Sequence, residues 1–185
     1  MTSTTPAPAR GISHLVLNVR DIEASHRFWT EVMGWEHCAS LRRPSALGTD
    51  MRFYRCSPDH HHDVAIVQVP NPESLPSGSD WDMRPSGLGL NHVAITYDRE
   101  SWLRQLAHLQ AQGWEFKRRV NHGMTHSVYI ADPDGNGLEL LYDLPHEVWQ
   151  DDVEAALNYV EALPTTGPEA LEDNTDYHSF AKAPA

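Results

Sequence analysis

An internal repeat constrains the fold of this chain more than any other feature. The segment GISHLVLNVRD at residues 11–21 is echoed by GLNHVAITYD at residues 89–98, and each copy continues into a helix-like run that ends in Gly-Trp-Glu. The histidines of the two copies, His14 and His92, lie 78 residues apart. In a chain of 185 residues, such a repeat predicts two small modules that share one core.

Each copy has the pattern of a strand, a helix and three further strands. The first strand of each alternates with period two. Asp21 and Asp98 are suited to cap the following helices, and Gly34 and Gly113 are natural stops. The remaining strands are predicted at 35–42, 50–56 and 62–69 in the first copy, and at 114–120, 125–131 and 137–142 in the second.

These patterns predict an α+β fold in which two βαβββ modules pair into one curved mixed sheet that cups a metal site. The tail carries Val153, Leu157, Val160 and Leu163 at a spacing that suggests a short amphipathic helix. The expected organisation within one domain is a disordered lead-in at 1–10, a first module at 11–69, a Pro-, Ser- and Gly-rich linker at 70–88, a second module at 89–145, and a C-terminal helix and tail at 146–185.

Composition excludes several classes of protein. The formal net charge of −12 argues against nucleic-acid binding, which needs a basic surface. No apolar run approaches the roughly 18 residues of a membrane span, and the N-terminus lacks the hydrophobic region of a secretory signal. Cys38 and Cys56 form no CxxC pair. We therefore expect a cytoplasmic protein with free thiols.

Two strand histidines and one strand carboxylate indicate a metal centre. If the first strands of the two modules are equivalent, His14 and His92 point into one cavity, and strand parity turns Glu139 toward the same cavity. Aligning the last strands puts Ala65, or a neighbouring apolar residue, where Glu139 lies in the second copy. A lone strand histidine is more often structural, but a buried carboxylate is costly without a partner. Three ligands would leave about three coordination positions open.

Residues 11–143 resemble the vicinal oxygen chelate superfamily. The resemblance rests on the histidine-bearing first strands and on the DPDGNGLEL segment that contains Glu139. The chain is most similar to single-domain type I extradiol ring-cleavage dioxygenases of the catechol 2,3-dioxygenase or dihydroxybiphenyl dioxygenase kind. This resemblance implies that His14, His92 and Glu139 bind Fe(II), with Mn(II) as the alternative metal.

The same resemblance implies roles for residues around the metal. Tyr129 lies ten residues before Glu139, as a tyrosine does in extradiol enzymes, and His122 falls where bacterial catechol dioxygenases place a substrate-binding histidine. The His-Asp-Val-Ala segment that carries their acid–base histidine is similar to the segment that begins at His62. If the alignment of this segment with the family is shifted by one or two residues, the acid–base role falls to His61 or His60 instead.

An extradiol enzyme would use O2 to cleave a catecholic ring beside its two hydroxyls. Catechol, a dihydroxybiphenyl-like compound or an L-DOPA-like compound are the expected substrates, and we expect a homo-oligomer whose C-terminal tail serves as a lid. Two alternatives remain open. A glyoxalase-type isomerase or lyase usually has four protein ligands, and a bleomycin-resistance-like binding protein often lacks the metal triad.

Overall fold

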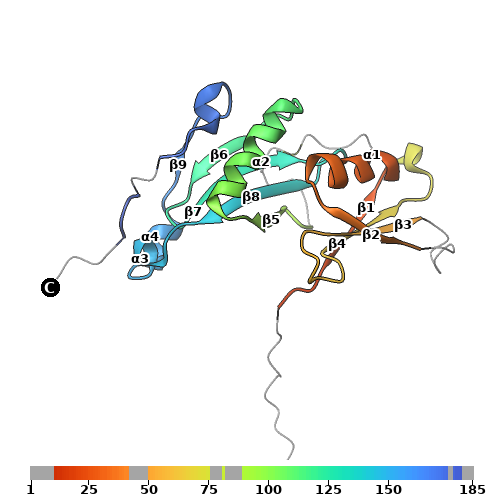
Figure 1. Cartoon of the computed structure of the whole chain (residues 1–185), viewed down its shortest axis with the longest axis horizontal. Coiled ribbons are helices and arrows are strands. Elements are labelled where there is room, and N and C mark those ends of the chain that lie inside the picture. Colours follow the sequence, from red (N-terminus) through yellow and green to blue (C-terminus); the bar gives the residue numbers. More distant parts are fainter. Residues whose placement is uncertain (1–10, 42–49, 76–80, 82–88, 175–176, 181–185) are drawn as a thin grey trace, which may run out of the picture. The chain divides into compact units, whose positions relative to one another are not determined.

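The computed structural model describes residues 11–41, 50–75, 81, 89–174 and 177–180 (Figure 1). The chain divides into two compact units, Met1–Ser74 and Leu75–Ala185, and each is described by itself. The lead-in expected at residues 1–10 lies outside the described residues. Within the described ranges, no helix combines the length and the apolar character that crossing a membrane requires.

The first unit has the predicted order of a strand, a helix and three strands. Its strands form one sheet in the order β1-β4-β3-β2, with β1 parallel to β4 and the other neighbours antiparallel. Its elements are β1 (Leu15–Val19), α1 (Ile22–Arg27), a π-helical turn (Phe28–Val32), β2 (Glu36–Ser40), β3 (Met51–Arg55), β4 (Val64–Gln68) and a 3-10 turn (Pro72–Ser74).

Local chemistry fixes where the first helix begins and ends. The Asp21 side chain accepts hydrogen bonds from the backbone N–H groups of Glu23 and Ala24, which satisfies donors that the first helical turn leaves free. Gly34 has a φ of 71°, a conformation that glycine adopts without steric cost. Phe28, Trp29 and other fully buried side chains fill the core of this unit.

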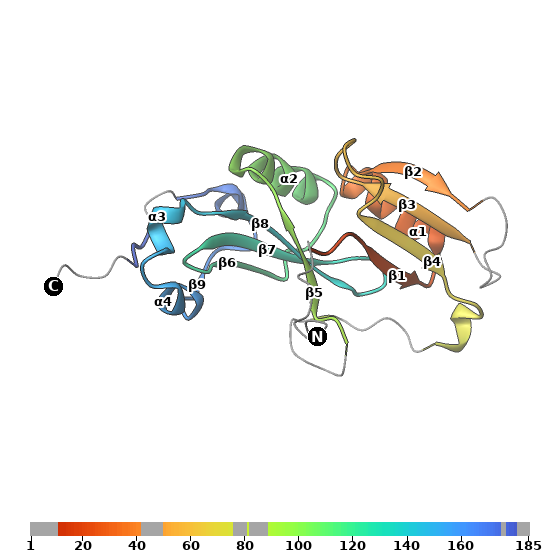
Figure 2. The same ribbon diagram turned by 90° about the horizontal axis from the view of Figure 1, so that it is seen from below.

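The second unit repeats the order and extends it. Its sheet has the order β5-β8-β7-β6-β9, and β5 and β8 are parallel (Figure 2). Its elements are β5 (His92–Thr96), α2 (Arg99–Ala111), β6 (Arg118–Asn121), β7 (Thr125–Ala131), β8 (Gly137–Asp143), α3 (His146–Trp149), α4 (Val153–Leu157), β9 (Glu161–Ala162) and a 3-10 turn (Pro168–Leu171).

Helix α2 covers one face of the second sheet and leaves the other for the site. Its Trp102, Leu106 and Leu109 are fully buried, and the Trp102 indole N–H donates to the Leu140 carbonyl at 2.8 Å. Successive residues of a strand point to opposite faces. Glu139 therefore points away from α2, as its strand parity predicts.

The tail differs from the expected amphipathic helix. Helix α4 ends at Leu157, and Glu161–Ala162 instead form β9, which pairs with β6 at the edge of the sheet. Val160 is 54% exposed, so the apolar stripe that suggested a longer helix is not buried. The α+β class is confirmed. The short amphipathic helix expected through Leu163 is present only as far as Leu157, because pairing with β6 satisfies the backbone beyond it at an open sheet edge.

Candidate functional site

Glu139 and Tyr129 form the centre of the candidate site in the second unit. They lie directly opposite each other on the antiparallel strands β8 and β7. The Tyr129 hydroxyl donates to Glu139 Oε1 at 2.8 Å. The ten-residue spacing seen in the sequence follows from this geometry, because the tight turn between the strands returns the chain to the same level of the sheet.

His92 approaches the same carboxylate from the neighbouring strand β5. Its Nε2 lies 3.1 Å from Glu139 Oε2, and Glu139 is only 8% exposed. A buried carboxylate oxygen and an imidazole nitrogen thus converge on one point. Such a nitrogen and oxygen pair suits a divalent transition metal.

His122 extends this hydrogen-bonded group. Its Nε2 lies 2.9 Å from the Tyr129 oxygen. Since the Tyr129 proton is given to Glu139, His122 Nε2–H must donate here, which leaves Nδ1 as an acceptor in the neutral ring. Burial lowers the pKa of His122, although the Glu139 carboxylate opposes the shift. Burial and the bond to Glu139 also raise the pKa of Tyr129, so both groups stay neutral at pH 7.

A cavity of about 300 Å³ opens beside these groups. This volume is at the lower end of the range for small-molecule sites. Its wall combines four polar side chains with three apolar ones. One of the apolar side chains, Leu157, comes from tail helix α4. The lining residues are His122, Met124, Thr125, Tyr129, Glu139, Leu141 and Leu157.

Trp81 is a member of the site that the sequence patterns did not identify. Its ring centroid lies 6.3 Å from those of both His92 and Tyr129. A Cβ on Gly137 would lie 2.2 Å from the indole, so the absence of a side chain there makes room for the ring. The available signal was a lone aromatic residue within a linker of small and polar residues.

A second group of predicted site residues lies in the first unit. His14 immediately precedes β1, and its ring centroid lies 4.3 Å from that of His62. His61 Nδ1 lies 2.7 Å from His62 Nδ1. Burial, followed by the neighbouring His14 and His61, lowers the pKa of His62. His60 is instead paired with Asp63 at 2.6 Å.

The two modules align residue by residue at the site. Two residues after His92, Ala94 pairs with Glu139; two residues after His14, Val16 pairs with Ala65. Ala65 therefore holds the position that Glu139 holds in the second module, as the sequence alignment predicted. His14 and His92 belong to different units, so the convergence of all three ligands remains a prediction.

The opposite face of the second sheet carries a separate buried network. His126, which strand parity marked as structural, contacts Asp173 of the tail at 2.7 Å. Tyr142 and Arg99 also donate to this carboxylate, at 2.8 and 2.7 Å. Although burial opposes ionisation, these hydrogen bonds hold the pKa of Asp173 below its usual value.

Comparison with known proteins supports the fold. The model of the Glyoxalase/Bleomycin resistance protein/Dioxygenase superfamily matches residues 11–140. A solved domain described as glyoxylase/bleomycin resistance protein/dioxygenase, from Frankia sp. EAN1pec, aligns with a TM-score of 0.58 at 20% identity. The alignment covers 74% of this chain and 100% of that domain, and at this identity it shows the fold alone.

Curated relatives include enzymes of two kinds. The catechol-2,3-dioxygenase of Bacillus subtilis is 29% identical over 163 residues, 86% of this chain and 50% of that protein. Biphenyl-2,3-diol 1,2-dioxygenase 3 of Rhodococcus globerulus is 29% identical over 133 residues, 71% of this chain and 63% of that protein. Lactoylglutathione lyase of Schizosaccharomyces pombe is 27% identical over 157 residues, 76% of this chain and 50% of that protein.

The chain thus spans between half and two thirds of the length of these relatives. The family match covers well over half of this chain and includes both histidine-bearing strands and Glu139. The chain belongs to the Glyoxalase/Bleomycin resistance protein/Dioxygenase superfamily.

Proposed function

We propose that this protein is an Fe(II)-dependent extradiol dioxygenase that inserts O2 into a catecholic ring. The observation that carries this proposal is the broken symmetry of the repeat, in which Ala65 occupies the position equivalent to Glu139. The site then has one carboxylate and two histidines, His14 and His92, with the two modules acting as one domain. Three protein ligands leave room for a bidentate diol and for O2.

The described donors fit such a metal. His92 Nε2 and Glu139 Oε2 approach to 3.1 Å, and Tyr129 holds the second carboxylate oxygen through its hydroxyl. A carboxylate ligand that is itself hydrogen-bonded is oriented for the metal by its partner. The nitrogen and oxygen donors suit Fe(II), and Mn(II) is the alternative.

The protein's own groups would manage protons and orientation. When bound, iron(II) would supply the chemistry that activates oxygen beside the diol. His62 would accept a proton from a substrate hydroxyl, because its lowered pKa keeps the imidazole in the basic form at neutral pH. The same side chain could return the proton later in the reaction.

His122 and Tyr129 would orient the substrate oxygens. Nδ1 of His122 remains available as an acceptor, because Nε2 already donates to Tyr129. Leu141 and Leu157 add apolar wall to the cavity, which suits one face of an aromatic ring and displaces water from it.

The register also weighs against the rival activities. A glyoxalase-type site with four protein ligands would need a carboxylate at the position of Ala65, which is fully buried. A binding protein without catalysis would not need the hydrogen-bonded carboxylate that Glu139 and Tyr129 form. Both observations favour a dioxygenase over an isomerase or a binding protein.

The direct test is ring cleavage by the full chain. The protein would be reconstituted anaerobically with Fe(II), then mixed with oxygenated catechol, 2,3-dihydroxybiphenyl or L-DOPA. We expect a coloured ring-fission product and one O2 consumed per substrate, and no reaction with hydroquinone, whose para hydroxyls cannot chelate one metal. The proposal is wrong if no diol drives O2 uptake while the metal-loaded protein isomerises a glutathione hemithioacetal.

A further inference from the structure

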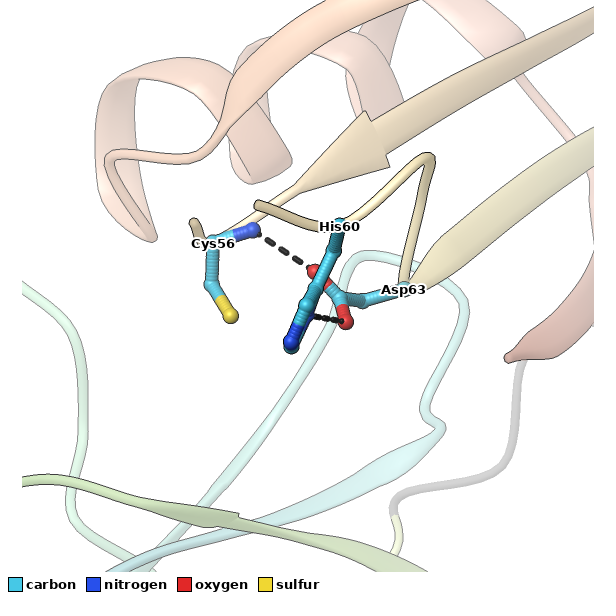
Figure 3. Close-up of side chains that lie close together, drawn as sticks. All are labelled: Cys56, His60 and Asp63. Carbon is cyan, nitrogen blue, oxygen red and sulfur yellow. Dashed lines mark hydrogen bonds and ion pairs between the residues drawn. The ribbon is translucent and has the colours of Figure 1, made fainter. Parts of the chain in front are cut away.

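The turn between β3 and β4 gathers three different metal-binding groups. Figure 3 shows Cys56, His60 and Asp63 directed toward one another at the surface of the first unit. One donor atom from each, a sulfur, an imidazole nitrogen and a carboxylate oxygen, lies within 4.8 Å of the others. In the part of the chain that the structure describes, these three residues form the group of potential metal ligands whose donor atoms all lie this close together.

Hydrogen bonds hold the three groups in place. Asp63 Oδ2 accepts from the Cys56 backbone N–H at 2.9 Å, and Asp63 Oδ1 lies 2.6 Å from His60 Nδ1. The backbone N–H of Asp63 donates to the Tyr54 carbonyl at 2.8 Å, and its carbonyl accepts from Leu15 at 2.9 Å. The turn is thus anchored to both neighbouring strands, so its side chains are arranged before any ligand arrives.

We propose that Cys56, His60 and Asp63 bind a zinc-like divalent cation, with the fourth position left to water. Zinc accepts thiolate, imidazole and carboxylate ligands, and in a tetrahedral site these donors lie roughly 3–4 Å apart. The cation would replace the proton now shared by His60 and Asp63, which requires a small separation of those two atoms. Cys56 and His60 are exposed, so the ion has a direct path from solvent.

A nucleophilic cysteine is the main rival interpretation of the same three residues. Such a cysteine needs a lowered pKa so that the thiolate is present at neutral pH. Burial, followed by the Asp63 carboxylate, instead raises the pKa of Cys56. A divalent cation beside the sulfur would offset that effect, whereas catalysis by the free thiol would be hindered.

The proposed cation would also fix the turn that carries His61 and His62. These two residues lie between His60 and Asp63 in the sequence, and their ring centroids are 4.5 Å apart. Cross-linking the ends of a short turn restricts the conformations open to the residues inside it. The bound cation would therefore restrain the turn, and its existence does not depend on the dioxygenase proposal.

Cobalt(II) is a suitable probe because its complexes with thiolates have a strong near-ultraviolet charge-transfer band. The reduced, chelator-treated full chain would be titrated with cobalt(II). We expect one equivalent to produce the band, and Cys56→Ser and His60→Ala to abolish or strongly weaken it. Cys38→Ser is the matched control and should retain the band, because Cys38 is the other free thiol of the same unit.

The iron site contains no sulfur donor, so the two proposals can fail separately. Glu139→Gln should leave the cobalt band unchanged even if it abolishes oxygen chemistry. The cation site is rejected if cobalt(II) in excess gives no thiolate band, if the band persists in Cys56→Ser, or if Cys38→Ser also removes it. Circular dichroism of each variant would confirm that the fold is intact, and Zn²⁺ should displace the cobalt.

Discussion

The two modules share one order of elements but differ in one pair of facing side chains. In the second module Tyr129 faces Glu139 across β7 and β8, and the two are hydrogen-bonded. At the equivalent places in the first module, Phe53 faces Ala65 across β3 and β4. The carboxylate and the hydroxyl that orients it are thus present together or absent together, so the difference in chemistry is concentrated in this facing pair.

The tail is a second difference between the modules. It follows the second sheet around its β6 edge: Leu157 lines the cavity on one face, β9 pairs with β6, and Asp173 reaches the buried network on the other face. The same short segment therefore contributes both to the wall of the candidate site and to the stability of the unit.

The largest effect is expected from Glu139→Gln, which removes the carboxylate that distinguishes the modules. A neutral amide is a poor ligand for a divalent ion, so we expect iron content to fall and turnover to drop by about 1,000-fold or more, because the metal supplies the chemistry. Iron per chain and O2 uptake would be measured together. Glu154→Gln, an exposed carboxylate of the tail, is the control. Full iron occupancy with normal turnover in Glu139→Gln would refute the ligand assignment.

The second-largest effect is expected from Asp173→Asn, which should lower the stability of the protein. This change leaves Arg119, which is 2% exposed and 3.7 Å from Asp173, with a weaker partner. Breaking a buried ion pair typically costs about 3 kcal/mol. We expect a loss of that size in the free energy of unfolding by urea at pH 7, and a negligible loss in Asp151→Asn, where the carboxylate is exposed.

The pH dependence of the same residue follows from its lowered pKa. The stabilisation is fully present above the 3.8 of an unperturbed aspartate and is lost as the pH falls through the lower value of the folded state. Wild type should therefore lose stability across this acidic range more steeply than Asp173→Asn. Equal slopes for the two proteins would show that the carboxylate is not ionised in the network.

Tyr129→Phe places in the second module the residue that Phe53 provides at the equivalent position of the first module. Glu139 and His122 would both lose a hydrogen bond, and removal of a group that orients a metal ligand typically costs about 10- to 100-fold in metal affinity or activity. Iron binding and turnover are the measurements. Tyr54→Phe, which removes a hydroxyl bonded to His26 in the first unit, should lower stability slightly without this loss. An unchanged iron affinity and rate in Tyr129→Phe would mean that Glu139 needs no orienting partner.

The smallest effect is expected from Leu157→Ala, which tests the tail as a wall of the cavity. Leu157 is 64% exposed, so little apolar contact is lost, and we expect KM for a catechol to rise by about threefold with kcat unchanged. Val160→Ala, outside the cavity lining, is the control. Truncation at about Pro145 is a poorer test, because it also removes Asp173 and so combines the effects on the wall and on stability.

Much of the fold could be predicted because the repeat fixes the order of elements twice. The capping residue Asp21 and the stop Gly34 gave the ends of the first helical segment, and strand parity gave the face of Glu139. The position of Tyr129 opposite Glu139 could be predicted because a tight turn lies midway between the two residues. Such local rules depend on a few neighbouring residues, which the sequence displays directly.

Features that depend on long-range contacts could not be predicted in this way. The apolar spacing through Val160 indicates a helix, but pairing of β9 with β6 decides the conformation there. The contact of Trp81 with Gly137 joins residues far apart in the chain, as does the contact of Asp173 with His126. No local pattern identifies such partners.

Trp81 offers a fluorescent probe of the part of the candidate site that contains His92. Its indole N–H is buried and has no hydrogen-bond partner among the residues that the structure describes, and its ring lies beside His92. A paramagnetic iron bound to His92 would quench the fluorescence of so close an indole. The difference in emission between wild type and Trp81→Phe would then report metal occupancy directly, before any substrate is known.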